Sequence, residues 1–493
     1  MNKNQVFIRN CLFLLLAILL VLISNNGLTA TQQQAKQMTL YEAIALALRY
    51  NRTVESAYLG RIIEKFNLKV AQDDFYPHLS VSASIYQAHT NRKDTLTTNI
   101  GSELSLKIPT GGEFELAWKQ SVIEPWNIPA DGATSDLTLS FRQPLLKGGG
   151  VDVNMASQVI AMRQEQTNIQ NLKETLIRTI TDVIHTYRNF LLAKRSLEIS
   201  RLSVERSQNF LQRFKALIEA GREAQVDIIQ TETSLANQEL SYYRNENALD
   251  NARISLLRLL DIDRHSLIEP VELLEVKEVY LDAEQLQQIA YDNQPAYLKA
   301  LLAHENANTN LLLARNNKLW ELDIITHYNI TGTSDSWLEA QKQAGYLDRG
   351  DYSVGLSLRI PFGDLKLKQS VLAAKVAREQ SQINLQELKE NIKIDIQDAV
   401  RDIDIKWEEV RLAQRVRELS KKQLEAELEK FKVGRSSNFR IVSFQGELVG
   451  AENGEVGAKI NYLNAITDLD VLLGISLERR GINIKNVRNV QLP

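Results

Sequence analysis

The chain has 493 residues, of which 44% are hydrophobic and 24% are charged, so it carries enough apolar material to fold and is not a disordered protein. Its formal net charge of -3 and its pI near 6.2 give no electrostatic basis for binding nucleic acid. Cys11 is the only cysteine, so disulfides do not stabilise this protein.

The first 30 residues have the pattern of an export signal. Lys3 and Arg9 precede an unbroken apolar run from Cys11 to Ile23, and a small-residue site follows near Ala30. Cys11 precedes the apolar core instead of closing it, which disfavours a lipid-anchored cysteine at a processing site. We therefore expect residues 1–30 to be a signal peptide. No later segment has the run of about 18 apolar residues that a membrane-spanning helix needs.

Short segments with alternating polarity predict amphipathic strands. From Leu79 to Ile85 the odd positions are apolar and the even positions are serine. The same period of two recurs at 104–108, 113–118, 137–141, 322–330 and 354–360. A β-barrel with lipid outside and water inside requires such strands. A soluble sheet with one wet face is the alternative, and the export signal favours the barrel.

Two very long helical runs make up most of the remaining chain. The first extends from Gly150 to Gly221, which at 1.5 Å per residue is on the order of 100 Å, longer than the interior of a globular domain. The second run has an apolar stripe containing Ile392, Ile396 and Ile403, and a further apolar set recurs every 11 residues: Ile383, Ile394, Ile405 and Val416. Residues two apart on a helix lie about 200° apart, so this helix has two apolar flanks and a neighbour on each. The 11-residue period predicts nearly straight helices closed into a tube, with a free coiled-coil hairpin as the alternative.

An internal duplication organises the chain. Leu137–Pro144 recurs as Val354–Pro361, and each copy precedes a long helical run that ends at a glycine, Gly221 or Gly434. We expect a first repeat over 31–270, with strands at about 78–146, a long helix at about 151–219, a tip at 220–228 and a return helix to about 260. The second repeat covers 271–480, with strands at about 322–361, a long helix at about 364–432, a tip at 433–441 and a return helix to about 474. Residues 481–493 form a tail.

The two repeats differ in one place. The first repeat has about 25 extra residues before its long helix, around the turn Ile108–Gly112, where proline and glycines favour a tight turn. These residues either add two strands to the barrel or form an appended hairpin.

The sequence resembles the TolC-like outer-membrane efflux proteins from Leu40 to about Leu477. The segment Leu40–Asn51 has a repeat partner in Leu281–Pro295, which keeps the family's Asn-x-Pro ending, whereas Thr53 stands where proline is usual in the first copy. The strand-to-helix junctions Gln143–Gly149 and Ile360–Gly363 also resemble those of the family.

The resemblance implies an α+β fold, in which a trimeric outer-membrane β-barrel continues into a long periplasmic α-helical barrel. It implies a homotrimer in outer-membrane lipid that serves as the exit duct of a tripartite efflux or type I secretion system. Its partners would be a periplasmic adaptor, or membrane fusion protein, and an inner-membrane pump reached through the adaptor. The six histidines are scattered and no phosphate loop or nucleophile elbow occurs, so we expect no enzyme, cofactor or metal. A barrel-anchored structural coiled-coil protein and a soluble periplasmic adaptor are the alternatives.

The resemblance also assigns roles to the two tips. Gly221, Arg222, Gly434 and Arg435 would dock the adaptor. The periplasmic gate would contain four residues: Asp227, Phe431, Arg440 and Ser443.

The second tip departs from the family pattern. The best-known members place two aspartates at the positions of Arg440 and Ser443, so we do not expect an acid-lined gate that binds cations. Three inward-pointing copies of Arg440 would favour anions. Alternatively, Arg440 pairs with Asp227 between neighbouring helices, which we favour because each lies six residues after its tip glycine.

Overall fold

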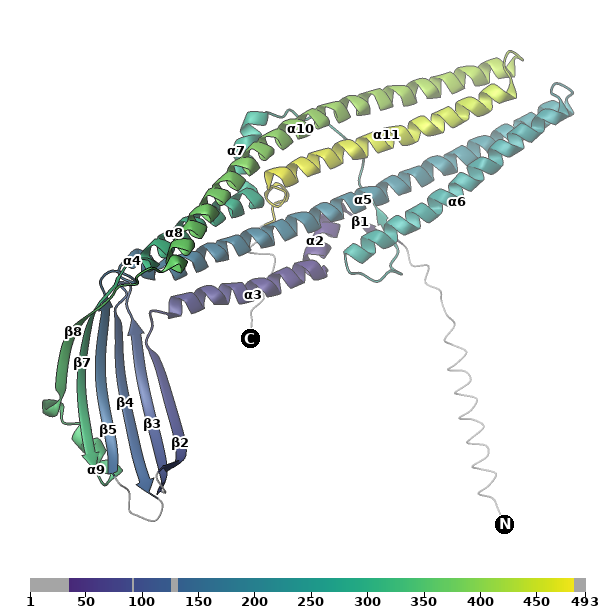
Figure 1. The fold of residues 1–493 in the computed structure, drawn as a ribbon. Helices are drawn as coiled ribbons and strands as arrows, with labels where there is room; N and C mark the ends of the chain where they lie inside the picture. Colours follow the sequence, from purple (N-terminus) through teal and green to yellow (C-terminus); the bar gives the residue numbers. More distant parts are fainter. Residues whose placement is uncertain (1–34, 91–92, 126–131, 483–493) are drawn as a thin grey trace, which may run out of the picture.

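A computed structural model describes residues 35–90, 93–125 and 132–482. The predicted signal peptide of residues 1–30 and nearly all of the predicted tail lie outside the described residues. The described chain has a bundle of long helices at one end and a curved sheet at the other (Figure 1). Among the described helices, none combines the length and the apolar content that crossing a membrane requires.

One six-stranded antiparallel sheet contains nearly all of the strands. In spatial order these are β2 (His78–Thr90), β3 (Lys93–Lys107), β4 (Glu113–Pro125), β5 (Gly132–Pro144), β7 (Glu321–Ser334) and β8 (Asp351–Arg359). The extra pair of the first repeat, β3 and β4, lies within this sheet instead of forming an appended hairpin. Between β7 and β8 the chain forms a helix, α9 (Trp337–Ala344), and a 3₁₀ turn, η2 (Leu347–Arg349). The sequence pattern predicted only strands over 322–361.

The register of the sheet separates apolar from polar side chains. One row across the six strands contains Leu79, Leu104, Leu116, Leu139, Tyr328 and Tyr352. The next row, on the opposite face, contains Ser80, Glu103, Ala117, Thr138, Asn329 and Asp351. We call the first the apolar face of the sheet and the second its polar face. The alternation along each strand therefore continues across the whole sheet.

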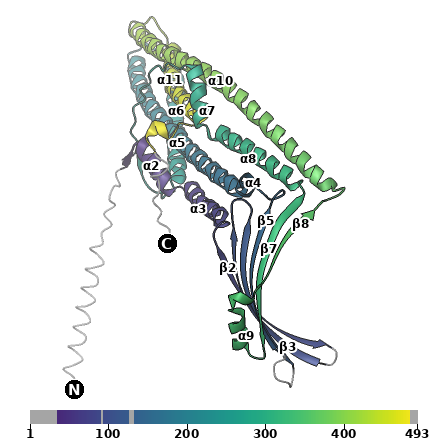
Figure 2. The ribbon, with the colours of Figure 1, turned by 90° about the vertical axis from the view of Figure 1, so that its left-hand side faces the viewer.

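Two helical hairpins form the bundle. The first consists of α5 (Ala156–Glu219, 64 residues) and α6 (Ile228–Leu259), and the second of α10 (Leu365–Lys432, 68 residues) and α11 (Asn438–Leu473). At the sheet end, α3 (Arg52–Asp73) packs on α5, and α8 (Pro295–Asn317) packs on both α5 and α10. The hairpins run side by side and their turns lie at the end far from the sheet (Figures 1 and 2).

Short elements surround the middle of the bundle. They are β1 (Lys36–Met38), α2 (Leu40–Tyr50), β6 (Ile268–Pro270), α7 (Ala283–Asn293) and η3 (Glu478–Arg480), whereas α4 (Val151–Asn154) lies at the sheet end (Figure 1). β1 pairs in parallel with β6, and the Tyr187 hydroxyl on α5 donates a 2.8 Å hydrogen bond to the Met38 carbonyl. Thr39 and Glu42 form a capping box that starts α2. α2 and β6 pack on α5 of the first hairpin, and α7 packs on α10 and α11 of the second, while α5 and α11 contact each other directly.

The two flanks of α10 differ in burial. Ile392, Ile396 and Ile403 are at most 1% exposed and pack against α11 and α7. The set at 11-residue intervals, Ile383, Ile394, Ile405 and Val416, is 51% to 63% exposed, and we call it the outer stripe of α10. The protomer thus buries one predicted flank and leaves the other open.

Candidate functional site at the helical tips

The same backbone motif ends both long helices. Gly221 has φ +70° and Gly434 has φ +73°, in the left-handed region that glycine adopts without strain. At the first tip the Arg222 N–H bonds to the Leu217 carbonyl at 2.9 Å, and at the second the Arg435 N–H bonds to the Lys430 carbonyl at 2.9 Å. These bonds close a Schellman motif, which satisfies carbonyls that the helix end leaves free. Both arginine side chains emerge into solvent directly after the turn.

One buried asparagine joins the two tips. Asn438, the first residue of α11, donates a 2.9 Å hydrogen bond from Nδ2 to the Asp227 carbonyl oxygen. Its Oδ1 accepts a 3.0 Å hydrogen bond from the Thr231 hydroxyl on α6. Because both partners belong to the other hairpin, this side chain fixes the position of one tip relative to the other along the axis of the bundle.

A cluster of phenylalanines lies behind the turns. The Phe431 ring packs 5.6 Å from Phe210 and 6.4 Å from Phe214, centroid to centroid, and Ile441 and Leu424 complete the contact. Phe431 is only 9% exposed, between α10 and α5. We expected Phe431 to line the gate, whereas in the protomer its ring fills the core between the two hairpins.

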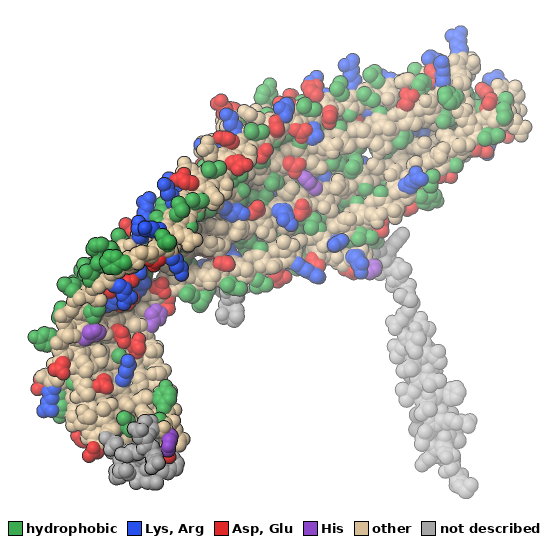
Figure 3. All heavy atoms as spheres, in the orientation of Figure 1, with side chains coloured by type: hydrophobic (Ala, Val, Ile, Leu, Met, Phe, Trp, Pro, Cys, Tyr) green, Lys and Arg blue, Asp and Glu red, His purple; other side chains and the backbone are tan. Residues whose placement is uncertain are grey.

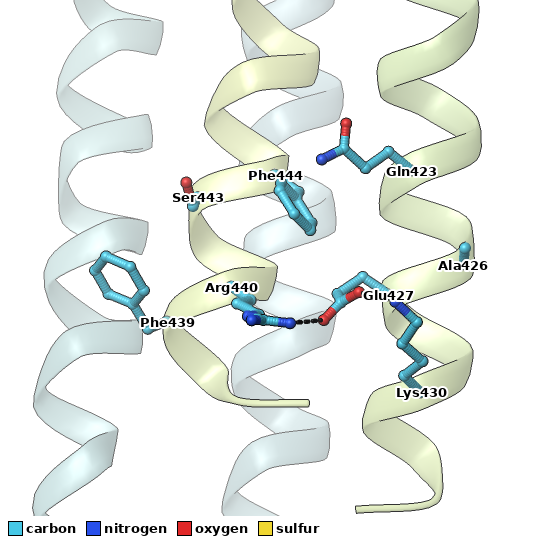
Figure 4. Close-up of a pocket in the computed structure, with 8 residues that line it drawn as sticks. All are labelled: Gln423, Ala426, Glu427, Lys430, Phe439, Arg440, Ser443 and Phe444. Atoms are coloured by element: carbon cyan, nitrogen blue, oxygen red, sulfur yellow. Dashed lines mark hydrogen bonds and ion pairs between the residues drawn. The ribbon is translucent and has the colours of Figure 1, made fainter. Parts of the chain in front are cut away.

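Arg440 reaches across the second tip to an acid on the preceding helix. Its guanidinium lies 3.5 Å from Glu427 on α10 (Figure 4). The Glu427 carboxylate also accepts hydrogen bonds from Lys430 Nζ at 2.8 Å and from Ser436 Oγ at 2.7 Å, and the side chain is only 4% exposed. We call these four residues the Glu427 clasp. Within the protomer, Arg440 pairs with Glu427 and not with Asp227, so the expected Asp227–Arg440 pair is replaced by a pair inside one hairpin.

The clasp depends on the charge of its central carboxylate. The hydrogen bond from Lys430, followed by that from Ser436, lowers the pKa of Glu427 to about 2. The carboxylate therefore stays ionised at neutral and mildly acidic pH. Since Glu427 is near the end of α10 and Ser436 and Arg440 follow the turn, an ionised Glu427 holds the turn closed.

The remaining predicted gate residues are at the surface. Asp227 is exposed at the start of α6, and Ser443 is exposed on α11, where its hydroxyl donates a 3.3 Å hydrogen bond to Glu447. Ser443 and Arg440 line the same surface pocket as Glu427 and Phe444, whereas Phe439 points away from Glu427 (Figure 4).

Exposed apolar side chains surround the two tips. Val226 and Ile229 flank the first turn, and Val433 and Phe439 flank the second. Together with Arg222 and Arg435 they form a mixed apolar and cationic surface at the far end of the bundle. Within the described ranges, no group of three or more histidine, aspartate or glutamate side chains is placed to hold a metal ion. The arrangement is suited to binding another protein.

The sequence matches a family model of known proteins. Residues 127–261 match the family model described as outer membrane efflux protein. The resemblance to the TolC-like outer-membrane efflux proteins is confirmed. The matched segment contains β5, α4, α5, the first tip and α6. No curated protein matches the sequence.

Solved structures share the fold over nearly the whole chain. The CmeC outer membrane channel of Campylobacter jejuni has a TM-score of 0.65 at 14% identity, with 90% of each chain covered. VceC from Vibrio cholerae has a TM-score of 0.65 at 11% identity, covering 88% of this chain and 96% of its own. The open state of the MtrE outer membrane channel of Neisseria gonorrhoeae has a TM-score of 0.66 at 14% identity, with 89% of each chain covered. With the family match, these outer-membrane proteins support an outer-membrane location.

Two important residues of the tips escaped the sequence analysis. Glu427 and Asn438 looked like ordinary polar residues of a long helix and of a helix start. A glutamate three residues before Lys430 usually forms a solvated pair on a helix surface. Only the fold of the turn brings Ser436 and Arg440 onto Glu427, so no local pattern marks it.

Proposed function

We propose that this protein is the outer-membrane exit duct of a tripartite efflux or type I secretion system. Three copies would close their sheets into a β-barrel in the outer membrane and their helices into a tube across the periplasm. Substrates would pass from an inner-membrane pump, joined through a periplasmic adaptor, to the outside. The observation that carries this proposal is that the two open edges of the sheet continue into two open edges of the helical bundle.

The sheet has two strands with unpaired edges. β2 pairs only with β3, and β8 pairs only with β7. On the apolar face, Val81 and Ile85 of β2 and Val354 and Leu356 of β8 are largely exposed. Open edges with apolar side chains invite pairing with another chain. Joining β8 of one copy to β2 of the next is a heterologous contact, which makes a ring when the rotation between successive copies closes, as a trimer would require.

The helices that adjoin these edges carry matching apolar surfaces. β2 follows α3, whose exposed side recurs at helical spacing: Leu59, Ile63, Phe66 and Val70. β8 precedes α10, whose outer stripe is the matching exposed apolar surface. α3 and α10 lie on opposite sides of the protomer (Figure 1). The same heterologous contact would therefore bury the α10 edge of one copy and the α3 edge of the next copy.

The barrel would be wide. Three six-stranded sheets together supply eighteen strands, and barrels of roughly 16 to 18 strands leave an aqueous channel. The polar face, with Glu103, Thr138 and Asn329, would line this channel and the apolar face would meet lipid. The extra pair β3 and β4 contributes a third of the wall, so it sets the width of the exit.

The tips would provide the docking surface and the gate. Arg222 and Arg435, with the apolar side chains beside them, would meet the adaptor at the periplasmic end. The gate would involve Asp227, Arg440 and Ser443, and the Glu427 clasp would keep each second tip in its closed turn. Since Arg440 is held by Glu427 in the protomer, an anion-attracting ring of free arginines has less support than it had from the sequence.

Conductance across planar lipid bilayers tests the proposal. Purified protein should insert and give discrete ohmic current steps. Arg440→Ala, which removes the ion pair with Glu427, should raise the conductance of each step. Arg411→Ala is the matched control, because Arg411 also pairs with a glutamate on α10 but lies far from the tip. Stable insertion without any current in either protein would contradict the duct and support a barrel-anchored structural protein.

A further inference from the structure

A short helix lies on the apolar face of the sheet, at the end far from the long helices (Figure 2). α9 packs over β5 and β7, with Ala340 and Ala344 buried against the strands. Gly332 on β7 makes this contact possible, because a Cβ at this position would overlap the Ala340 carbonyl oxygen. α9 is therefore fitted to this part of the sheet and is not a loose loop.

The patch beneath α9 contains buried polar groups on the mainly apolar face of the sheet. Gln120 and Ser135 face each other across β4 and β5, and they are only 9% and 1% exposed. The Trp118 indole N–H donates a 2.9 Å hydrogen bond to the Ser135 hydroxyl. In contact with lipid, such polar groups would have no water to bond to, which is costly. α9 covers them.

α9 also closes an open strand edge. The pairing of β7 with β8 ends at Asn329, so β7 continues alone to Ser334. The Thr333 N–H donates a 3.1 Å hydrogen bond to the Gln343 side-chain oxygen of α9, and the Tyr328 hydroxyl donates to the Leu347 carbonyl. One backbone N–H at the unpaired end of β7 thereby gains a partner from α9, and the Tyr328 side chain is bonded to the turn after it.

The outward side of this segment mixes aromatic, apolar and charged groups. Trp337 and Leu338 at its start, and Tyr346 and Leu347 after its end, are exposed. Lys342 forms a 2.7 Å ion pair with Glu339 on the same surface. Tryptophan and tyrosine concentrate where lipid headgroups meet water, and a charged pair excludes the hydrocarbon interior. The composition fits the headgroup level of a bilayer.

The dimensions of the sheet agree with this level. On β7, Gly332 lies beneath α9, and Leu322 lies ten residues earlier, at the end of the strand nearest the long helices. Ten residues of extended chain span roughly 33 Å, or about 25 Å across the membrane at the usual strand tilt, which equals the height of the apolar band of membrane barrels. Hydrophobic side chains also gather around the junction of β8 and α10 (Figure 3).

We propose that α9, with the turn through Leu347, is a lipid-interface anchor on the outside of the barrel. It would lie at the headgroup–acyl boundary of the leaflet farthest from the helices and seal the polar patch of Gln120 and Ser135. Lipid is the occupant because β5 lies inside the sheet and α9 itself bonds the end of β7 that extends beyond β8, whereas another copy would contact β2 and β8. The inference rests on the proposed function in one respect, that the apolar face lies in a membrane.

Fluorescence quenching by nitroxide-labelled lipids tests the anchor. Single cysteines would be introduced into a Cys11→Ser background, labelled with an environment-sensitive fluorophore, and the full-length protein reconstituted in phosphatidylcholine vesicles. The nitroxide is placed either near the headgroup or deep in the acyl chain. Leu338→Cys probes the outer side of α9, Leu139→Cys probes the apolar face of β5 beyond α9, and Thr134→Cys probes the polar face of the same strand at the height of α9.

The anchor predicts that the Leu338 label is quenched about twofold more by the shallow nitroxide than by the deep one. The Leu139 label should show the reverse order, and the Thr134 label should be quenched by neither. If the Leu139 label is quenched and the Leu338 label is not, α9 lies outside the bilayer or is covered by protein. The anchor is then wrong, although the proposal that the sheet lies in a membrane is retained. If Thr134 is quenched in place of Leu338 and Leu139, the faces are reversed and α9 lies in the channel. If none is quenched, the proposed function itself fails.

Discussion

Removing the outer stripe of α10 should weaken the trimer without unfolding the protomer. Ile394 and Ile405 are 54% and 51% exposed in the protomer and would be buried by the neighbouring copy. Truncating each to alanine removes roughly 50 Å² of apolar contact, worth about 1 to 1.5 kcal/mol at 25 cal/mol per Å². The two sites are three turns apart, so their effects should add, to about 2 to 3 kcal/mol per interface and about 6 to 9 kcal/mol over three interfaces.

Thermal dissociation in mild detergent measures this effect. The Ile394→Ala/Ile405→Ala variant should dissociate at a lower temperature than the wild type, as seen on native gels after stepwise heating, while its far-ultraviolet circular dichroism at low temperature is unchanged. Ile392→Ala/Ile403→Ala is the matched pair on the inner flank. Because those side chains are buried within the protomer, it should lose about 2 to 5 kcal/mol per site in folding itself and reduce the yield of folded protein. If the Ile394→Ala/Ile405→Ala variant dissociated at the wild-type temperature, the inference that α10 packs against a neighbour on each of its two flanks would be refuted.

Three further predictions concern the tips. Asn438→Ala should cost about 1 to 2 kcal/mol of local stability, because it removes two hydrogen bonds between the hairpins, and should speed amide hydrogen exchange at both tips but not in the sheet. The pKa of Glu427 is lower in the folded protein than in the unfolded chain, so protection of the second tip from hydrogen exchange should be complete above about pH 4.5 and fall toward pH 2. Glu427→Gln should remove this pH dependence. Glu429→Gln, which changes an exposed ion pair nearby, should retain it. Gly434→Leu should cost about 1 to 2 kcal/mol at the turn, because its φ is positive, and should abolish export while trimers still form; loss of the trimers would mean that the tip is only structural.

Periodicity predicted much of the architecture. The alternation at Leu79–Ile85 and its repeats marked strands of the sheet, because the side-chain period of a strand is fixed at two. The 11-residue set on α10 predicted a second apolar flank, and the exposure of Ile394 and Ile405 in the protomer agrees with it. The strand prediction is confirmed because alternating exposure leaves a regular signal in the sequence, whereas the second neighbour of α10 stays a prediction.

Other features depend on contacts that no local pattern records. The sequence left the extra pair at Lys93–Pro125 open between sheet and hairpin, since both use the same alternation; strand pairing decides it. The sequence analysis did not anticipate α9, whose eight residues are too few for a clear helical period. It also paired Arg440 with Asp227 from equal spacing after the glycines, whereas Glu427, closer in the folded hairpin, takes that place.

The mass of the detergent-solubilised particle tests the central claim most directly. That claim is that the β8–α10 edge of one copy closes on the β2–α3 edge of another to make a duct. Native mass spectrometry in a mild detergent should give one species of three chains, each no heavier than the 56.0 kDa of the full sequence. A monodisperse monomer that is folded and stable in the same detergent would contradict the account, because its open edges would then need no partner.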